Sequence, residues 1–171
     1  MKLTVKQITI TGILGAIALV LGSTPLGFIP VPTPAGAATI MHIPVIIGAI
    51  MEGPIVGAFV GLIFGLFSFL RGGSPLFADP LIAILPRVLI GILAAYSYNL
   101  FSNKLVGAVG SATVGTLTNT IGVLSLAVIR GFLPNKEAAI GIGLTHGTPE
   151  VIVGIIITVI VVKALQKTDL N

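Results

Sequence analysis

The sequence predicts an all-α integral membrane protein, a single bundle of six helices, and three observations support this prediction. Hydrophobic residues make up 55% of the 171 positions and charged residues only 8%. The mean hydropathy is +1.15, whereas a soluble domain would carry roughly a quarter charged residues. The apolar residues also form stretches whose length is close to that of a membrane-spanning helix, about 20 residues. We therefore expect the lipid bilayer to surround this chain.

Six helices are expected within one domain of residues 1–171, and proline, glycine and polar residues set their limits. The predicted helices cover residues 4–22, 35–51, 54–70, 80–101, 105–129 and 148–165. A loop follows the first helix, because proline disrupts a helix interior and this stretch contains Pro25, Pro30, Pro32 and Pro34. The second helix contains Pro44, so we expect it to be kinked or to span only partly.

The later helices are separated by a tight corner at Glu52, by "RGGSPLFADP" after the third helix and by "SNK" after the fourth. Within the second of these segments, Arg71 and Asp79 are expected to be loop charges. A longer polar loop, "RGFLPNKEAAIGIGLTHG", is expected between the last two helices. Long loops often carry function, so the side of the membrane with the long loops is expected to hold the site.

An even number of spans places both termini on one side of the membrane, and the distribution of Lys and Arg indicates which side. The terminal side would hold Lys2, Lys6, Lys104, Lys163 and Lys167. The opposite side would hold Arg71, Arg130 and Lys136. Because cytoplasmic segments carry the excess of positive residues, we expect both termini in the cytoplasm and the long loops outside the cell.

A row of small residues stands at every fourth position of "GPIVGAFVGLIFG", namely Gly53, Gly57, Gly61 and Gly65. In a soluble helix each glycine would cost about 1 kcal/mol relative to alanine. In lipid, small residues four apart allow two helix backbones to approach closely. The row predicts a packing face, either within the bundle or against another subunit.

Five polar residues in or near the outer half of the predicted spans are candidates for substrate binding: His42, Arg87, Asn119, His146 and Glu150. Ionisable residues inside a membrane are costly and often functional, and an arginine can hold a carboxylate through two hydrogen bonds. Structural alternatives stay open: an Arg87–Glu150 ion pair, a buried structural His42, helix association through Asn119, and exposure of Glu150 and His146 at the rim.

Catalysis is not expected, and no cofactor or metal is predicted. The chain has no cysteine, which excludes thiolate metal sites and a cysteine nucleophile. It lacks the GxxxxGK[ST] motif of ATP-binding loops, and its histidines and carboxylates do not have metal-site spacing. Its net charge of +4 comes from scattered residues rather than a basic run, so nucleic acid is not an expected partner.

The chain resembles the substrate-binding S components of energy-coupling factor (ECF) vitamin transporters of prokaryotes. The resemblance covers nearly the whole length and includes "MHIPVIIGAIMEGPIVGAFVGLIFGLFSFL" and "PLIAILPRVLIG". It implies a plasma-membrane subunit that captures a vitamin outside the cell and works with a membrane T component and two ATPases. These partners would supply the energy, in keeping with the missing ATP-binding motif.

The resemblance also implies contacts with the T component through small residues four apart on the first helix. The matching positions here are Gly12 and Ala16, a departure from the alanine-only form of that motif. The glycine row from Gly53 to Gly65 is expected to serve the same region as a smooth face against the scaffold.

The substrate is expected to be pantothenate, because the chain looks most like the pantothenate-type members and because Arg87 suits a small carboxylate-bearing ligand. Aromatic residues are only 6% of the chain and tryptophan is absent, which disfavours stacking on a flat ring. Riboflavin, folate and hydroxymethylpyrimidine are the other substrates considered. The alternative functions are a stand-alone secondary transporter or channel for a small anion, or a membrane scaffold without a ligand.

Overall fold

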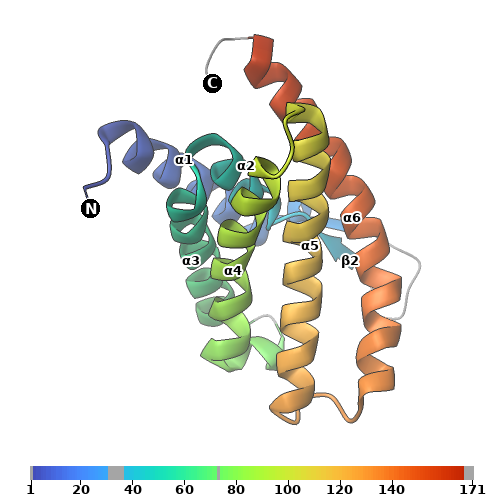
Figure 1. Ribbon diagram of the computed structural model, residues 1–171. Coiled ribbons are helices and arrows are strands. Elements are labelled where there is room, and N and C mark those ends of the chain that lie inside the picture. The colour runs from blue at the N-terminus through green and yellow to red at the C-terminus, as the bar shows by residue number, and fades with distance from the viewer. Residues whose placement is uncertain (1, 31–36, 73, 168–171) are drawn as a thin grey trace.

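The computed structural model describes residues 2–30, 37–72 and 74–167, and helices make up most of it (Figure 1). The helices are α1 (Val5–Ser23), α2 (Ile43–Glu52), α3 (Pro54–Arg71), α4 (Pro80–Asn99), α5 (Lys104–Ile129) and α6 (Lys136–Lys167). The connections contain the short 3-10 helices η1 (Pro25–Gly27) and η2 (Pro75–Ala78) and the antiparallel strands β1 (Phe28–Pro30) and β2 (Ala37–Thr39). In the described part of the chain, five helices, all except α2, are long and apolar enough to cross a membrane.

The second helix differs from its prediction over residues 35–51. Residues 37–39 form strand β2, and α2 begins only at Ile43, while residues 35 and 36, like Pro32 and Pro34, lie outside the described residues. Pro44 does not kink this helix, because it stands in the first turn, where a missing N–H is tolerated. Ten residues span only about 15 Å, so α2 is too short to cross a bilayer.

The core of the bundle lies around α2, whose residues from Ile43 to Ile50 are all buried. They pack with apolar side chains of the surrounding helices, among them Val56, Val60 and Ile90, which are fully buried. A helix that is apolar on all sides suits this central position.

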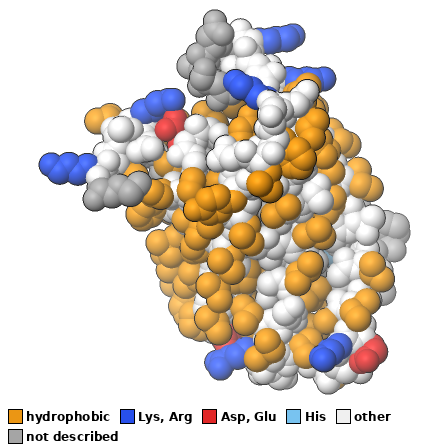
Figure 2. All heavy atoms as spheres, viewed as in Figure 1, with side chains coloured by type: hydrophobic (Ala, Val, Ile, Leu, Met, Phe, Trp, Pro, Cys, Tyr) orange, Lys and Arg blue, Asp and Glu red, His pale blue; other side chains and the backbone are white. Residues whose placement is uncertain are grey.

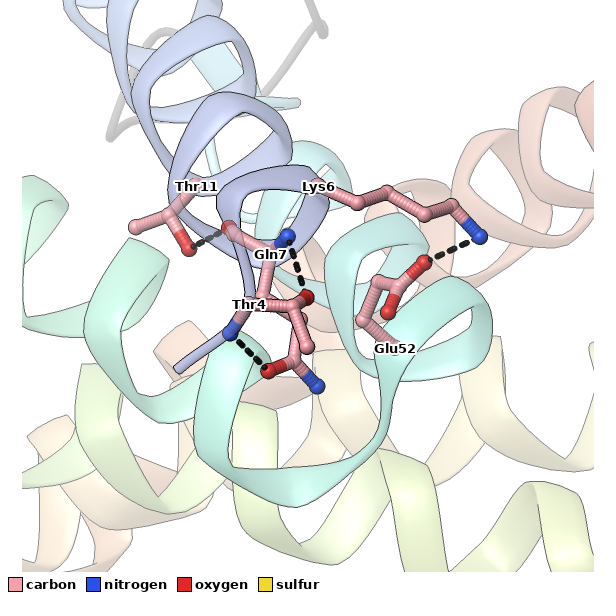
Figure 3. Close-up of polar contacts among 5 residues, drawn as sticks. All are labelled: Thr4, Lys6, Gln7, Thr11 and Glu52. Carbon is pink, nitrogen blue, oxygen red and sulfur yellow. Dashed lines mark hydrogen bonds and ion pairs between the residues drawn. The ribbon is translucent and has the colours of Figure 1, made fainter. Parts of the chain in front are cut away.

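The start of α1 is fastened to the end of α2 (Figure 3). Thr4 caps the helix by accepting from Gln7 N, and the Gln7 side chain accepts from Thr4 N in return. Lys6 Nζ lies 2.7 Å from Glu52 Oε1. The chain therefore crosses the bundle and returns between the start of α1 and the end of α2.

The glycine row of α3 packs inside the subunit, against α4. A Cβ atom on Gly61 would lie 2.1 Å from the carbonyl oxygen of Arg87, and one on Gly65 would lie 2.8 Å from the Cα of Ile84. A Cβ atom on Gly57 would lie 2.9 Å from the Cα of Gly91 on α4. The expected T-component face on Gly57, Gly61 and Gly65 is therefore wrong, because α4 already occupies it; the expectation of packing within the bundle fits. Gly53 lies outside this contact, at the turn between α2 and α3, where its φ is +86°.

The loop expected over residues 130–147 is mostly helical, because α6 begins at Lys136 rather than near residue 148. Asn135 accepts a hydrogen bond from Ala138 N and so caps the first turn. Pro149 lies inside the helix, where packing against a neighbouring helix lets a membrane helix tolerate proline. Here Gly147 lies against Thr120 of α5.

Charged and apolar side chains are separated on the surface, as in a protein that spans a bilayer. On the face drawn in Figure 2, Lys, Arg, Asp and Glu side chains gather toward the two ends and apolar side chains cover the band between them. Figure 1 shows the start of α1 and the end of α6 toward one end of the molecule, with the α3–α4 and α5–α6 connections at the other.

Candidate functional site

A cavity of about 500 Å³ lies among the helices at the end where α3 connects to α4, and it is the candidate site. Side chains from β1, β2, α3, η2, α4, α5 and α6 line it. Four of the five predicted binding residues are among them: Arg87, Asn119, His146 and Glu150. The fifth, His42, does not line the cavity. The fold thus brings together residues that lie up to 63 positions apart in the sequence.

Arg87 is held by α4 and is 3% exposed. Its Nη1 donates to the carbonyl oxygen of Ile82 at 2.7 Å, whereas its buried Nε has no hydrogen-bond partner among the described residues. The guanidinium carbon lies 4.6 Å from the ring centre of Phe77 and 5.4 Å from that of Phe64, where each ring attracts a cation. Arg87 therefore presents a positive charge and an unused donor in an aromatic setting.

The expected alternative for Arg87, an ion pair with Glu150, does not form. The ion pairs among the described residues are Lys6–Glu52 and Asp79–Arg130, so no Arg87 nitrogen lies within 4.0 Å of a Glu150 oxygen. The cavity keeps a cation on α4 and a carboxylate on α6 that do not neutralise each other directly.

Glu150 binds Thr39 of β2, which also lines the cavity. Its Oε1 accepts from Thr39 N at 2.8 Å and from Thr39 Oγ1 at 3.1 Å. Its Oε2 lies 3.3 Å from the hydroxyl of Thr120 on α5. At 7% exposure the carboxylate is buried rather than standing in water at the rim.

Asn119 and His42 lie on adjoining parts of the interior. The side-chain oxygen of Asn119 is buried and has no hydrogen-bond partner in the described residues. His42 Nε2 lies 2.9 Å from Thr116 Oγ1, in a fully buried position. Thr116 precedes Asn119 by one helical turn, so His42 contacts the helix that carries Asn119 and does not reach the cavity itself.

His146 owes its position to the unexpected first half of α6. Ile142, His146 and Glu150 all line the cavity and are four residues apart, which places them on one face of a helix. The Nδ1 atom of His146 lies 3.1 Å from Thr145 Oγ1 and 3.3 Å from the carbonyl oxygen of Ile142. A loop, which the sequence suggested, would not have fixed this register.

Arg71 is a cavity residue that the sequence analysis missed, and its assignment as a loop charge was wrong. It is the last residue of α3 and lines the cavity. Its Nη1 donates to the carbonyl oxygen of Gly22, and its guanidinium carbon lies 5.6 Å from the ring centre of Phe28 on β1. A cation at the end of an apolar run is ordinary in a membrane protein, so the pattern held no signal for this role.

Asp79 and Thr39 also acquire partners that only the fold supplies. Asp79 caps α4 by accepting from Leu81 N and receives a hydrogen bond of 2.6 Å from Arg130 Nε. This bond from Arg130 is the main reason that the pKa of Asp79 lies below its ordinary value of 3.8. Thr39 lies 111 positions from Glu150, which it binds.

Comparison with known proteins identifies the family. A family model described as the ECF transporter substrate-specific component matches residues 6–165. The chain belongs to this family. The substrate-specific component described here is also 36% identical over 161 residues to a protein of Lactococcus lactis subsp. cremoris named pantothenic acid transporter PanT, an alignment that covers 78% of this chain and 80% of the relative. A protein of Leuconostoc mesenteroides named pantothenate transporter PanT is 33% identical over 180 residues, covering 89% of this chain and 88% of the relative.

Membership of this family makes the chain a transport subunit rather than an enzyme, and a multi-pass protein of the bacterial plasma membrane. It implies a small vitamin as substrate, and a T component and ATPases as partners. The expected resemblance to the S components is thereby confirmed.

Proposed function

We propose that this substrate-specific component captures pantothenate from outside the cell and holds it in the cavity lined by Arg87, Asn119, His146 and Glu150. The relatives named pantothenate transporters support this substrate. The observation that carries the proposal is a pair of buried atoms without partners on the cavity wall, Arg87 Nε and Asn119 Oδ1. Buried polar groups are nearly always hydrogen-bonded, so these two atoms call for a ligand with both an acceptor and a donor.

Pantothenate has the chemistry that this cavity requires. It carries a carboxylate at one end, an amide in the middle and two hydroxyl groups at the other end. The carboxylate would pair with Arg87, and the hydroxyl groups would donate to acceptors on α5 and α6. Its two methyl groups suit a cavity that Phe64, Phe77 and other apolar side chains also line.

The proposed topology has six crossings with both termini in the cytoplasm and the cavity open to the outside. The Lys6–Glu52 ion pair supports it, because the chain must cross and return between these residues. Since α2 is only ten residues long, the returning segment would combine α2 with the β1–β2 hairpin. The hairpin would then fill the outer half of the crossing, next to the cavity.

The proposed partners are a T component and two ATPases, with α1 as the contact surface. Gly12 and Ala16 are both exposed on α1, and a Cβ on Gly12 would meet no atom within 4 Å. Exposed apolar residues surround them, among them Ile13 and Val20. Another helix can therefore approach this surface closely, because small residues allow close contact between membrane helices.

The first test is to identify what the purified protein binds. Mass spectrometry of small molecules released on denaturation should find pantothenate, and calorimetry with the emptied protein in lipid nanodiscs should show saturable binding. Replacing Arg87 by Ala should weaken binding by about 2 to 5 kcal/mol, the usual loss for one partner of a buried charge pair, or roughly 30- to 5,000-fold in Kd.

Arg130→Gln is the matched control, since Arg130 is an arginine at the same end of the bundle that does not line the cavity. It should leave the Kd for pantothenate within a factor of about two. An unchanged affinity in Arg87→Ala would show that Arg87 has a structural role only.

A further inference from the structure

We propose that Glu150 makes the cavity selective for an unphosphorylated substrate, because it requires a hydrogen-bond donor at the end of the ligand opposite the carboxylate. The inference rests on the proposed function and deepens it: the cavity would take pantothenate and reject its ester with phosphate on the terminal hydroxyl. The two oxygens of Glu150 are occupied to different extents.

The first oxygen, Oε1, is committed to the protein. Thr39 N donates to it at 2.8 Å and Thr39 Oγ1 at 3.1 Å. The backbone N–H can only donate, so Oε1 acts as an acceptor. These bonds fix the carboxylate between α6 and the β1–β2 hairpin, where it cannot turn away from the cavity without breaking them.

The second oxygen, Oε2, has no donor of its own. Among the described residues, the hydrogen-bond donor to Oε2 is the Thr120 hydroxyl at 3.3 Å, and that hydroxyl also lies 3.2 Å from the carbonyl oxygen of Thr116. A hydroxyl has one hydrogen to donate, so the two acceptors share it. Oε2 therefore keeps most of its capacity to accept from a ligand.

The cavity lining on α5 offers a second acceptor. Asn119 lines the same cavity, and its buried Oδ1 has no partner among the described residues. No ion pair reaches Glu150 in the described part of the chain. A hydroxyl group can donate to these oxygens, whereas a fully ionised phosphate only accepts and carries the same sign of charge as Glu150.

The positive charge of the cavity comes from α3 and α4. Arg87 holds the positive charge and the unused Nε donor on α4, and Arg71 adds a second cation. With Glu150, the charged side chains lining the cavity are two cations and one anion. This balance matches a ligand with a single negative charge at one end, and the ligand would place its carboxylate toward α4 and its hydroxyl groups toward α5 and α6.

Competition binding in nanodiscs tests the inference with three ligands: pantothenate, its phosphate ester, and the analogue that lacks the terminal hydroxyl. In the wild-type protein the ester should bind at least about 100-fold more weakly than pantothenate, and the analogue at least about tenfold more weakly, because sites built around a substrate hydroxyl reject ligands without it. In Glu150→Gln the ratio between ester and pantothenate should fall at least tenfold, since the amide keeps an oxygen for Thr39 but carries no charge.

Glu137→Gln is the control, because it removes the same charge from an exposed position of α6 outside the cavity. It should leave both ratios unchanged. Failure of wild-type protein to bind pantothenate at all would overturn the proposed function. Binding of pantothenate with an unchanged ester ratio in Glu150→Gln would overturn this inference alone. If Glu150→Gln does not fold, wild-type protein decides the matter: equal affinity for pantothenate and the analogue without the hydroxyl contradicts a donor requirement.

Discussion

Arg87 shows how a single side chain is kept ready for a ligand. Removing a charge from water is costly unless hydrogen bonds replace the lost hydration, yet the protein supplies Arg87 with one carbonyl oxygen, from Ile82, and two phenyl rings. Glu150 is similarly incomplete, with one oxygen bonded to the hairpin and the other sharing a hydroxyl. Arg87 lacks an acceptor for its Nε, and Glu150 lacks a full donor for its Oε2. A ligand that bridges the two groups would stabilise both.

Asp79 and Arg130 provide a prediction on pH. The hydrogen bond from Arg130 lowers the pKa of Asp79 below 3.8, so its stabilising contribution is complete above that pH and disappears as pH falls through the folded-state pKa. Arg130→Gln should therefore lower the melting temperature at pH 7, and the difference from wild type should shrink at pH 3.

Thermal unfolding in detergent at both pH values would measure this difference. Lys136→Gln is the control, because it removes a positive charge nearby from a residue that makes no bond to Asp79. A difference between wild type and Arg130→Gln that is the same at pH 3 and pH 7 would argue against the Asp79 bond as its cause.

The contact between α3 and α4 is the helix pair on which the site depends. The glycine row of α3 lies on the backbone of α4, and Gly61 faces the carbonyl group of Arg87 itself. Any side chain at this position would push α4 outward and displace Arg87 from the cavity. The glycines that make α3 a poor helix in water are thus what allows α4 to present its arginine.

Gly61→Ala should therefore reduce both stability and ligand affinity. A Cβ placed 2.1 Å from a backbone oxygen cannot be accommodated by a side-chain rotation, and overpacking of this kind costs about 1 to 3 kcal/mol or more. The melting temperature and the Kd for pantothenate are the readouts. Gly12→Ala is the control, because its Cβ would meet open space; a Gly61→Ala protein that matches it in both readouts would mean that α3 and α4 can separate without consequence.

The bundle as a whole leaves α1 on its outside. Only 22% of the apolar stretch of α1 is buried, the same share as in α6 and less than the 50% of α4. The Lys6–Glu52 ion pair ties the first turn of α1 to the rest. Because most of its surface faces outward, α1 is available either to lipid or to another membrane subunit. The small residues Gly12 and Ala16 favour a subunit.

Replacing both Gly12 and Ala16 by Leu should abolish co-purification with the T component and ATPases while leaving the Kd for pantothenate unchanged. Two leucines would hold a partner helix away from α1, and α1 contributes no residue to the cavity lining. Gly141→Leu is the control, since Gly141 is also exposed on a helix with open space at its Cβ. Intact assembly of the double variant would place the partner contact elsewhere.

Much of the candidate site could be predicted because membrane burial makes polar residues conspicuous. Arg87, Asn119 and Glu150 stand out against apolar neighbours, and the structure brings all three to one cavity. Arg71 and Thr39 could not be found in this way, since a cation at the end of an apolar run and a threonine inside a predicted helix are unremarkable in sequence. Their roles come from contacts with residues far along the chain: Gly22 for Arg71 and Glu150 for Thr39.

The sequence by itself determined that the chain is a helical membrane protein, where most of its helices lie, and the family to which it belongs. These follow from hydropathy, proline positions and the local pattern, which act along the chain. Only the tertiary structure decided that the glycine row faces α4, that α2 is a short buried helix, and that α6 reaches back to carry His146 into the cavity. Those outcomes depend on which helix surfaces contact one another. In lipid, every apolar helix face is solvated about equally well, so close packing between helices rather than hydrophobicity determines these contacts.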